Sequence, residues 1–198
     1  MWSEKKAVSV SVAEPLKYLR AHTISLRSPR VAIECACGLA DQAENFPNMI
    51  YWLTGQPGAG KTTLATALKS ALRRQGYPVV HLDGEFLREL MGNKDFSQAG
   101  RTKNIRAAQK LAAKLHADGI IVVASFVSPY RSIREEFKTK SDVVEIYVHT
   151  NEIRGKENYF VADFEPPQYD FVDIDTTKVS VEACVERILQ RAPSSEPA

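Results

Sequence analysis

The stretch LTGQPGAGKTTLA at residues 53–65 constrains the fold of this chain more than any other. Its core, Gly55–Thr62, matches the pattern G-x-x-x-x-G-K-[S/T], follows the apolar run 49–53 and precedes a segment with helical periodicity. Glycines in such a loop accept positive φ and allow backbone N–H groups to point inward at phosphate oxygens, and the following helix adds its positive N-terminal end. The pattern therefore predicts a loop that holds the phosphate chain of a nucleoside triphosphate.

The residue types in this loop also predict individual roles. We expect Lys61 to reach the outer phosphates and the Thr62 hydroxyl to hold Mg²⁺. The loop positions expected to contact ATP are Gly55, Gln56, Pro57, Gly58, Ala59, Gly60, Lys61, Thr62 and Thr63. A phosphate loop does not identify the molecule that receives the terminal phosphate, so the acceptor has to be inferred from other stretches.

Strand and helix patterns alternate from residue 50 onward, which is typical of a parallel sheet. The run IIVVAS suits a strand that is buried on both faces. The expected strands cover 50–54, 77–83, 120–125 and 142–150, and the expected helices cover 61–75, 101–118 and 179–191. The chain is therefore predicted to be an α/β protein of the P-loop NTPase type, with its sheet sandwiched between helices.

Three segments differ in character. Residues 49–191 carry the convincing elements and are expected to form one P-loop domain. Residues 1–48 lack sustained periodicity, and two interpretations stay open: a poorly ordered extension, even one translated from an upstream start, or a small cap packed on the domain. The tail 192–198, APSSEPA, is expected to be disordered.

Composition narrows the kind of partner. Lys and Arg number 26 against 24 Asp and Glu, so no broad positive field points to nucleic acid or an anionic membrane. No membrane span and no secretory signal are expected, because the chain has no long apolar run. Cys35, Cys37 and Cys184 include no C-x-x-C pair, which favours a reduced cytoplasmic setting over a metal site. The expected partner is a small molecule.

The segment DGEFLR follows the second predicted strand, where ligands bind in sheets of this kind. Asp83 ends the strand, and a carboxylate there can orient an attacking hydroxyl and help to place Mg²⁺. The same residue equally suits a cap for the next helix. Arg88 lies five residues further on and is the first candidate for binding an anionic acceptor.

Two further stretches complete the candidate site. In DFSQAGRTKNIR, Arg101 and Asn104 lie three apart on one helix face, and Arg101 adds a second local positive charge. Phe96 either stacks on a base or belongs to the core. In SFVSPYR, the Ser-Pro turn exposes Ser128 and the backbone of Val127 to the same crevice.

Taken in order, these stretches resemble the adenylylsulfate kinase (APS kinase) family, which makes PAPS in sulfate activation. That family carries G-x-x-G-x-G-K-T-T, D-G-D-x-x-R, L-G-F-S…R-x-x-N-I-R and I-S-P-Y-R. This chain has Gly55–Thr63, DGEFLR, DFSQAGRTKNIR and VSPYR in the same order and at similar spacing. The resemblance covers roughly residues 49–150 and the C-terminal helix.

The resemblance implies a kinase that uses ATP and Mg²⁺ to phosphorylate the 3′-hydroxyl of adenylylsulfate, a step of sulfate assimilation, and it implies a homodimer. Asp83 would assist the hydroxyl, with Lys61 and Ser128 as the other catalytic candidates. Since phosphoryl transfer needs mainly positioning and charge neutralisation, direct transfer is sufficient and Ser128 is expected to be a contact rather than a phosphorylated carrier. The implied acceptor contacts are Asp83, Arg88, Phe96 on adenine, Arg101, Asn104, Val127, Ser128 and Lys156.

Departures from the family concentrate in one segment, EIRGKENYFVADFEPPQYDF. It keeps the family's K…Y…A spacing at Lys156, Tyr159 and Ala162, but Asp163 stands where the family has arginine, and the family's F-T-G stretch is missing, which leaves Phe164 before E-P-P. Upstream, the second acid of D-G-D is replaced by a glutamate, and L-G-F by K-D-F. We interpret the segment as a lid, with an ordinary surface connection as the alternative.

Two other functions stay open on the sequence. The altered lid favours a kinase of the same kind that phosphorylates a different nucleotide-linked or hydroxylated metabolite. A nucleotide-binding regulator with little turnover is the second alternative. Asp83 together with Arg88 and Arg101 argues against the regulator, because a sensor needs no positioned base.

Overall fold

The computed structural model describes residues 48–191, and the expectations for residues 1–47 and for the tail 192–198 lie outside this range. Five parallel strands form one sheet in the order β2-β3-β1-β4-β5. The strands are β1 (Ile50–Thr54), β2 (Val79–Asp83), β3 (Ile121–Ser125), β4 (Val143–His149) and β5 (Val172–Asp175). The helices are α2 (Lys61–Arg74), α3 (Gly84–Leu90), α4 (Gln98–Ala117), α5 (Arg131–Lys138), the 3₁₀ helix η2 (Glu157–Tyr159) and α6 (Val181–Arg191).

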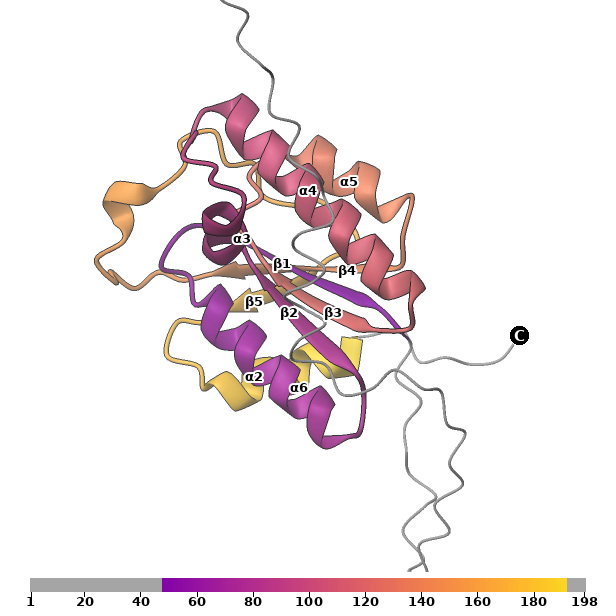
Figure 1. The fold of residues 1–198 in the computed structure, drawn as a ribbon. Coiled ribbons are helices and arrows are strands. Elements are labelled where there is room, and N and C mark those ends of the chain that lie inside the picture. Colours follow the sequence, from indigo (N-terminus) through magenta and orange to yellow (C-terminus); the bar gives the residue numbers. More distant parts are fainter. Residues whose placement is uncertain (1–47, 192–198) are drawn as a thin grey trace, which may run out of the picture. The chain divides into compact units, whose positions relative to one another are not determined.

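Helices cover both faces of the sheet, which confirms the predicted fold class. Helices α2 and α6 pack on one face, and α3, α4 and α5 pack on the other (Figure 1). The central strand β1 is buried on both sides: Tyr51 and Leu53 contribute to the core under α2 and α6, whereas Ile50 and Trp52 contribute to the opposite core. Among residues 48–191, no helix has both the length and the apolar character that crossing a membrane requires.

The expected strands and helices are all present, with ends that differ by up to three residues. Helix α4 begins at Gln98 rather than Arg101, because the hydroxyl of Ser97 accepts a hydrogen bond from the N–H of Gly100 and caps the helix. Strand β5 was not expected. Its sequence VDID alternates two buried apolar residues with two aspartates, so a four-residue edge strand shows only a weak pattern.

The sheet topology brings three strand ends to one edge. The carboxyl ends of β1, β2 and β3 are followed by the phosphate loop, by α3 and by residues 126–130. The register places Asp83 opposite Ser125, and Ser125 opposite Leu53, so these ends stand at one level. The first residue of the segment 126–130 anchors it to the core, because the ring of Phe126 stacks on Trp52 at 5.0 Å between centroids.

Candidate active site

The phosphate loop has the backbone that its glycines predict. Gly55 has φ 148, and a Cβ at this position would collide with the carbonyl oxygen of Val148 on β4. Gly58 has φ 82, and a Cβ there would meet the Cβ of Lys156 at 3.0 Å. Gly55 is therefore needed for close packing of the loop on the sheet. Gly58 is needed because the side chain of Lys156 approaches the loop there.

Lys61 lies across its own loop. Its Nζ donates to the carbonyl oxygen of Gln56 at 2.8 Å, and the side chain is buried. Burial lowers the pKa of Lys61 to about 8, against the opposing charges of Asp83 and Glu85. The ammonium group thus carries its charge at neutral pH in a largely desolvated position, where attraction to phosphate oxygens is strong.

Asp83 caps the next helix with one carboxylate oxygen and turns the other toward the phosphate loop. Its Oδ1 caps α3 by accepting from the N–H groups of Glu85 at 2.9 Å and Phe86 at 3.3 Å. Its Oδ2 accepts from the hydroxyls of Thr62 at 3.0 Å and Ser125 at 2.9 Å. Burial opposes ionisation, but the bonds from Ser125, the two N–H groups and Thr62 outweigh it and hold the pKa of Asp83 below its usual value. The carboxylate is therefore ionised and sits against the phosphate loop.

The oxygen atoms beside the loop fit a magnesium ion. Mg²⁺ prefers hard oxygen ligands, and the Thr62 hydroxyl and the Asp83 carboxylate are ligands of this kind. Their oxygen atoms lie 3.0 Å apart. Within residues 48–191, no group of three or more His, Cys, Asp or Glu side chains forms a metal cluster. This donor set suits an ion held largely by phosphate oxygens and water rather than by a protein cage.

The two arginines expected to bind the acceptor meet around one aromatic ring. The guanidinium carbon of Arg88 lies 4.3 Å from the centroid of Phe96, and that of Arg101 lies 5.8 Å from it. Arg88 Nη1 donates to the carbonyl of Asp95 at 2.7 Å, and Arg101 Nε donates to that of Phe96 at 2.8 Å. The side chain of Phe96 is 61% exposed, so it does not belong to the core and presents its ring to solvent.

Two buried polar atoms in this region have no hydrogen-bond partner within the described part of the chain. They are Oδ1 of Asn104 and Oγ of Ser128, whose residues are 3% and 2% exposed. Ser128 also has φ 42, a conformation that non-glycine residues rarely adopt. Unpaired buried polar atoms and local strain are both typical of ligand contacts. The carbonyl of Val127 is used internally, because it accepts from Thr54 Oγ1 at 2.8 Å.

Arg134 organises the site, and sequence reasoning missed it. The buried guanidinium donates to Glu145 Oε1, to the carbonyl of Ser128 and to the carbonyl of Glu165, each at 2.6 Å. It thereby fixes the strained Ser128 and, through Glu165, the segment 152–171 to α5 and β4. The available signal was the acid at 145 inside the apolar strand VVEIYVH, because a buried carboxylate needs a cationic partner.

The segment interpreted as a lid lies against the phosphate loop. The Gln56 side chain makes two hydrogen bonds with the backbone of Val161: Nε2 donates to its carbonyl, and Oε1 accepts from its N–H, both at 2.9 Å. Arg154 Nη1 donates to the carbonyl of Gly58 at 3.3 Å, and Nη2 donates to that of Thr176 at 3.0 Å. The sequence singled out Gln56 for ATP and did not single out Arg154, yet both join the lid to the loop.

Beyond Val161 the lid is packed on the domain. Burial, and then the charge and hydrogen bond of Asp163, raise the pKa of Tyr130, so the acid found in place of the family's arginine pairs with this hydroxyl. The ring of Phe164 stacks on Tyr147 at 6.0 Å between centroids. Phe164 is therefore engaged in packing against β4.

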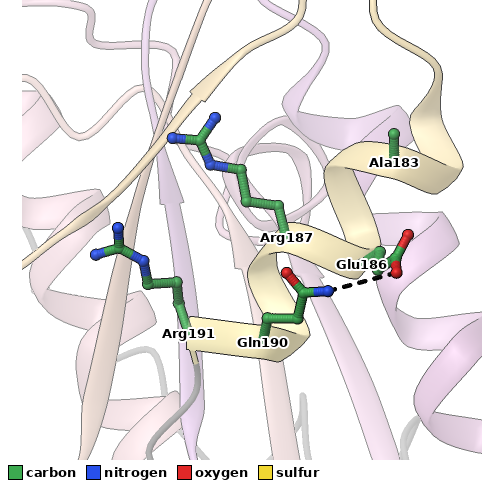
Figure 2. Close-up of a pocket in the computed structure, with 5 residues that line it drawn as sticks. All are labelled: Ala183, Glu186, Arg187, Gln190 and Arg191. Atoms are coloured by element: carbon green, nitrogen blue, oxygen red, sulfur yellow. Dashed lines mark hydrogen bonds between the residues drawn. The ribbon is translucent and has the colours of Figure 1, made fainter.

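Two surface hollows lie on the outer sides of α2 and α6. One, of about 590 Å³, is lined by Ala183, Glu186, Arg187, Gln190 and Arg191, and in it Gln190 is hydrogen-bonded to Glu186 (Figure 2). The other, of about 680 Å³, lies between the two helices. Helix α6 follows β5 and runs back from the carboxyl edge of the sheet, so these hollows are separate from the site built by Lys61 and Asp83.

Comparison with known proteins gives one consistent result. The family model described as Adenylylsulphate kinase matches residues 47–157, more than half of the chain. The adenylyl-sulfate kinase of Chloroflexus aurantiacus is 35% identical over 161 residues, which cover 71% of this chain and 87% of that protein. The enzyme of the same name from Prochlorococcus marinus is 33% identical, with coverages of 76% and 86%.

Solved structures agree on the fold. The crystal structure of APE1195 has a TM-score of 0.63 and 29% identity, and the match covers 72% of this chain and 92% of that one. The Mycobacterium tuberculosis APS kinase in complex with AMPPNP and APS has a TM-score of 0.64 at 20% identity, with coverages of 72% and 95%. At that identity the likeness concerns the fold alone.

Proposed function

Because the chain belongs to the adenylylsulphate kinase family, we propose that it transfers the γ-phosphoryl group of ATP to the 3′-hydroxyl of adenylylsulfate, giving PAPS. The observation that carries the proposal is the 3.0 Å contact between Thr62 of the phosphate loop and Asp83. It sets an ionised carboxylate from β2 directly beside the place where the triphosphate ends. A regulator that only binds nucleotide also needs a magnesium site, but it has no use for the two arginines, Arg88 and Arg101, that are candidates for binding an acceptor.

The residues of the phosphate loop bind and neutralise the donor. The inward N–H groups of the loop and the Lys61 ammonium group compensate the charge of the outer phosphates. Mg²⁺, held by Thr62 and Asp83 together with the phosphates, supplies further charge neutralisation when bound. Asp83 Oδ2 accepts the hydrogen bond of the acceptor hydroxyl and aims its oxygen at the phosphorus.

The acceptor side is built for an aromatic, anionic molecule. Arg88 and Arg101 supply two positive charges around Phe96, whose exposed ring is available to stack on adenine. Asn104 Oδ1 and Ser128 Oγ are free to take hydrogen bonds from the ligand. Among the described residues no base contacts the Ser128 hydroxyl, and a serine nucleophile needs such a base. We therefore assign Ser128 to binding rather than to a phosphorylated intermediate.

One observation favours a second acceptor within the same reaction class. Phe164 stacks on Tyr147, and the F-T-G stretch is missing from the sequence, so Phe164 is engaged elsewhere and does not pair with Phe96 around adenine. A kinase that phosphorylates another nucleotide-linked or hydroxylated metabolite is the alternative that follows. We assign the contact with either acceptor from the lid to Lys156, whose ammonium group lies 5.6 Å from the ring centroid of Tyr159.

The test is an ADP-release assay with ATP, Mg²⁺ and a panel of acceptors. The panel contains adenylylsulfate, adenosine 5′-phosphate and hydroxylated metabolites that lack a nucleotide. Turnover with adenylylsulfate alone supports the proposal, turnover with another acceptor supports the alternative, and tight ATP binding without ADP release refutes both. The proposal includes a homodimer in the cytoplasm, and light scattering on the purified chain tests the dimer.

A further inference from the structure

A histidine that no part of the proposed mechanism uses stands behind Asp83. His81 Nε2 lies 2.9 Å from Ser125 Oγ, and Ser125 Oγ lies 2.9 Å from Asp83 Oδ2. The next contact in line is the Thr62 hydroxyl, 3.0 Å from the same carboxylate oxygen. A continuous chain of hydrogen bonds thus runs from β2 through β3 to the phosphate loop.

The sheet register produces this chain. His81 and Asp83 lie two residues apart on β2, so both side chains project toward the same face, and Ser125 is the residue of β3 opposite Asp83. That face is covered by α2, which carries Thr62 and, further along, Lys69 close enough to influence His81 electrostatically. The imidazole is half-buried between the edge strand and this helix.

Counting protons fixes the direction of each bond. The Ser125 hydroxyl has one hydrogen, and the ionised Asp83 carboxylate can only accept, so the serine donates to Asp83. The serine oxygen must then accept from His81, which requires the proton on Nε2. Without that donor, only the bond to Asp83 holds the hydroxyl in the one staggered position of three that points at the carboxylate, and the serine oxygen loses its own hydrogen bond.

We propose that His81 is a positioning residue for phosphoryl transfer, which holds the Ser125 hydroxyl so that Asp83 Oδ2 stays aimed at the phosphate loop. Two backbone N–H groups pin Oδ1, and Ser125 pins Oδ2 from the side of the sheet. The open side of Oδ2 then faces Thr62 and the acceptor hydroxyl. The inference rests on the proposed function for its kinetic consequence, but its geometry is independent of that function.

The kinetic test compares His81→Leu, His81→Gln, Ser125→Ala and the double variant His81→Leu with Ser125→Ala. We expect kcat to fall about 5- to 10-fold in each single variant that breaks the chain, the equivalent of one aligned hydrogen bond. The KM values for ATP and acceptor should stay within about twofold, because binding contacts are untouched. Glutamine places an N–H donor at a similar distance and should restore most of kcat.

The double variant decides between positioning and mere packing. If His81 acts through Ser125, the double variant should be no slower than Ser125→Ala alone, whereas independent structural damage predicts losses that multiply. Multiplying losses, a raised KM with unchanged kcat, or failure of glutamine to restore activity would each overturn the proposal. Thermal unfolding of every variant identifies any that lose activity because they fail to fold.

A second measurement needs no turnover. Nitrogen-15 NMR of the full chain, labelled at its histidines, reports which ring nitrogen of His81 carries the proton, with His81→Gln used to assign the signal. A proton on Nε2 supports the hydrogen-bond chain, and a neutral ring with its proton on Nδ1 overturns it. Inactivity of the unaltered chain toward every acceptor would refute the proposed function without affecting this result.

Discussion

The double hydrogen bond between Gln56 and Val161 gives a sharp prediction about the lid. In Gln56→Met the side chain keeps its length and approximate volume but loses both the amide donor and the amide acceptor. The Val161 N–H, in a residue only 5% exposed, then loses its partner at 2.9 Å, and the carbonyl keeps only the weaker bond from the N–H of Phe164 at 3.2 Å. We expect the lid to detach from the phosphate loop more often while the domain stays folded.

The magnitude follows from the number of bonds lost. Each of the two contributes about 1 kcal/mol net, so local opening should become more favourable by about 2 kcal/mol. That difference raises the open population by about 30-fold. The global free energy of unfolding should change less, because the lid opens locally while the rest of the domain stays folded. Amide hydrogens of the lid therefore exchange through this local opening and not only through global unfolding.

Hydrogen exchange of the Val161 amide measures this opening directly. In Gln56→Met the exchange should be about 30-fold faster than in the unaltered chain, while amides of β1 and β3 keep their protection. Gln109→Met is the matched control: this buried glutamine donates to the carbonyl of Ile133 at 3.1 Å and so joins α4 to α5 rather than the lid to the phosphate loop. Unchanged Val161 exchange in Gln56→Met, or equal acceleration in Gln109→Met, would refute the clamp.

The remaining predictions concern the catalytic groups. Lys61→Ala should lower kcat by at least about 10²-fold in the ADP-release assay, and near-normal turnover would contradict its phosphate role. Asp83→Asn keeps an oxygen that can cap α3, so kcat should fall about 10²- to 10⁴-fold with little change in KM for ATP, and a pure binding defect would contradict the role of the carboxylate. Since the pKa of Asp83 is lowered in the folded chain, its ionised form stabilises the fold above the usual aspartate pKa; this stability is lost as the pH falls through the lowered value, and acid unfolding of Asp83→Asn should lack that loss. Arg88→Ala and Arg101→Ala should each raise the acceptor KM about 10- to 100-fold, whereas Arg106→Ala, whose guanidinium pairs with a glutamate of α5, should leave it unchanged.

Local patterns in the sequence predict most of the sheet and one side of the site. The strand 50–54, the loop at 55–62 and the start of α2 at Lys61 depend on residues that are adjacent in the chain. The positions of Asp83 and Ser128 follow from one further rule, that parallel strands end at the same edge. Each of these predictions depends on short-range periodicity or on a topological rule. Short-range periodicity and topological rules can both be applied without knowing individual side-chain contacts.

What sequence patterns miss are contacts between distant residues of unremarkable type. Gln56 and Val161 are 105 positions apart, and a valine backbone carries no signal that a glutamine will bind it. Arg134 resembles any charged residue of a short amphipathic helix, although it is almost fully buried and holds Ser128 in place. The conformation of the lid does not follow from the sequence for the same reason, since it depends on such contacts and not on local propensity.

The environment of Asp83 also limits what the carboxylate does in catalysis. Four donors lower its pKa, and a weaker base removes a proton less readily. Efficient proton abstraction before transfer would call for a raised pKa, as a carboxylate in an apolar pocket would have. In a loose transition state for phosphoryl transfer, however, the attacking oxygen forms little bond to phosphorus and keeps its proton until late, so orientation matters more than basicity. The four hydrogen bonds that make Asp83 a weak base also give it a fixed direction, and direction is what this reaction requires of it.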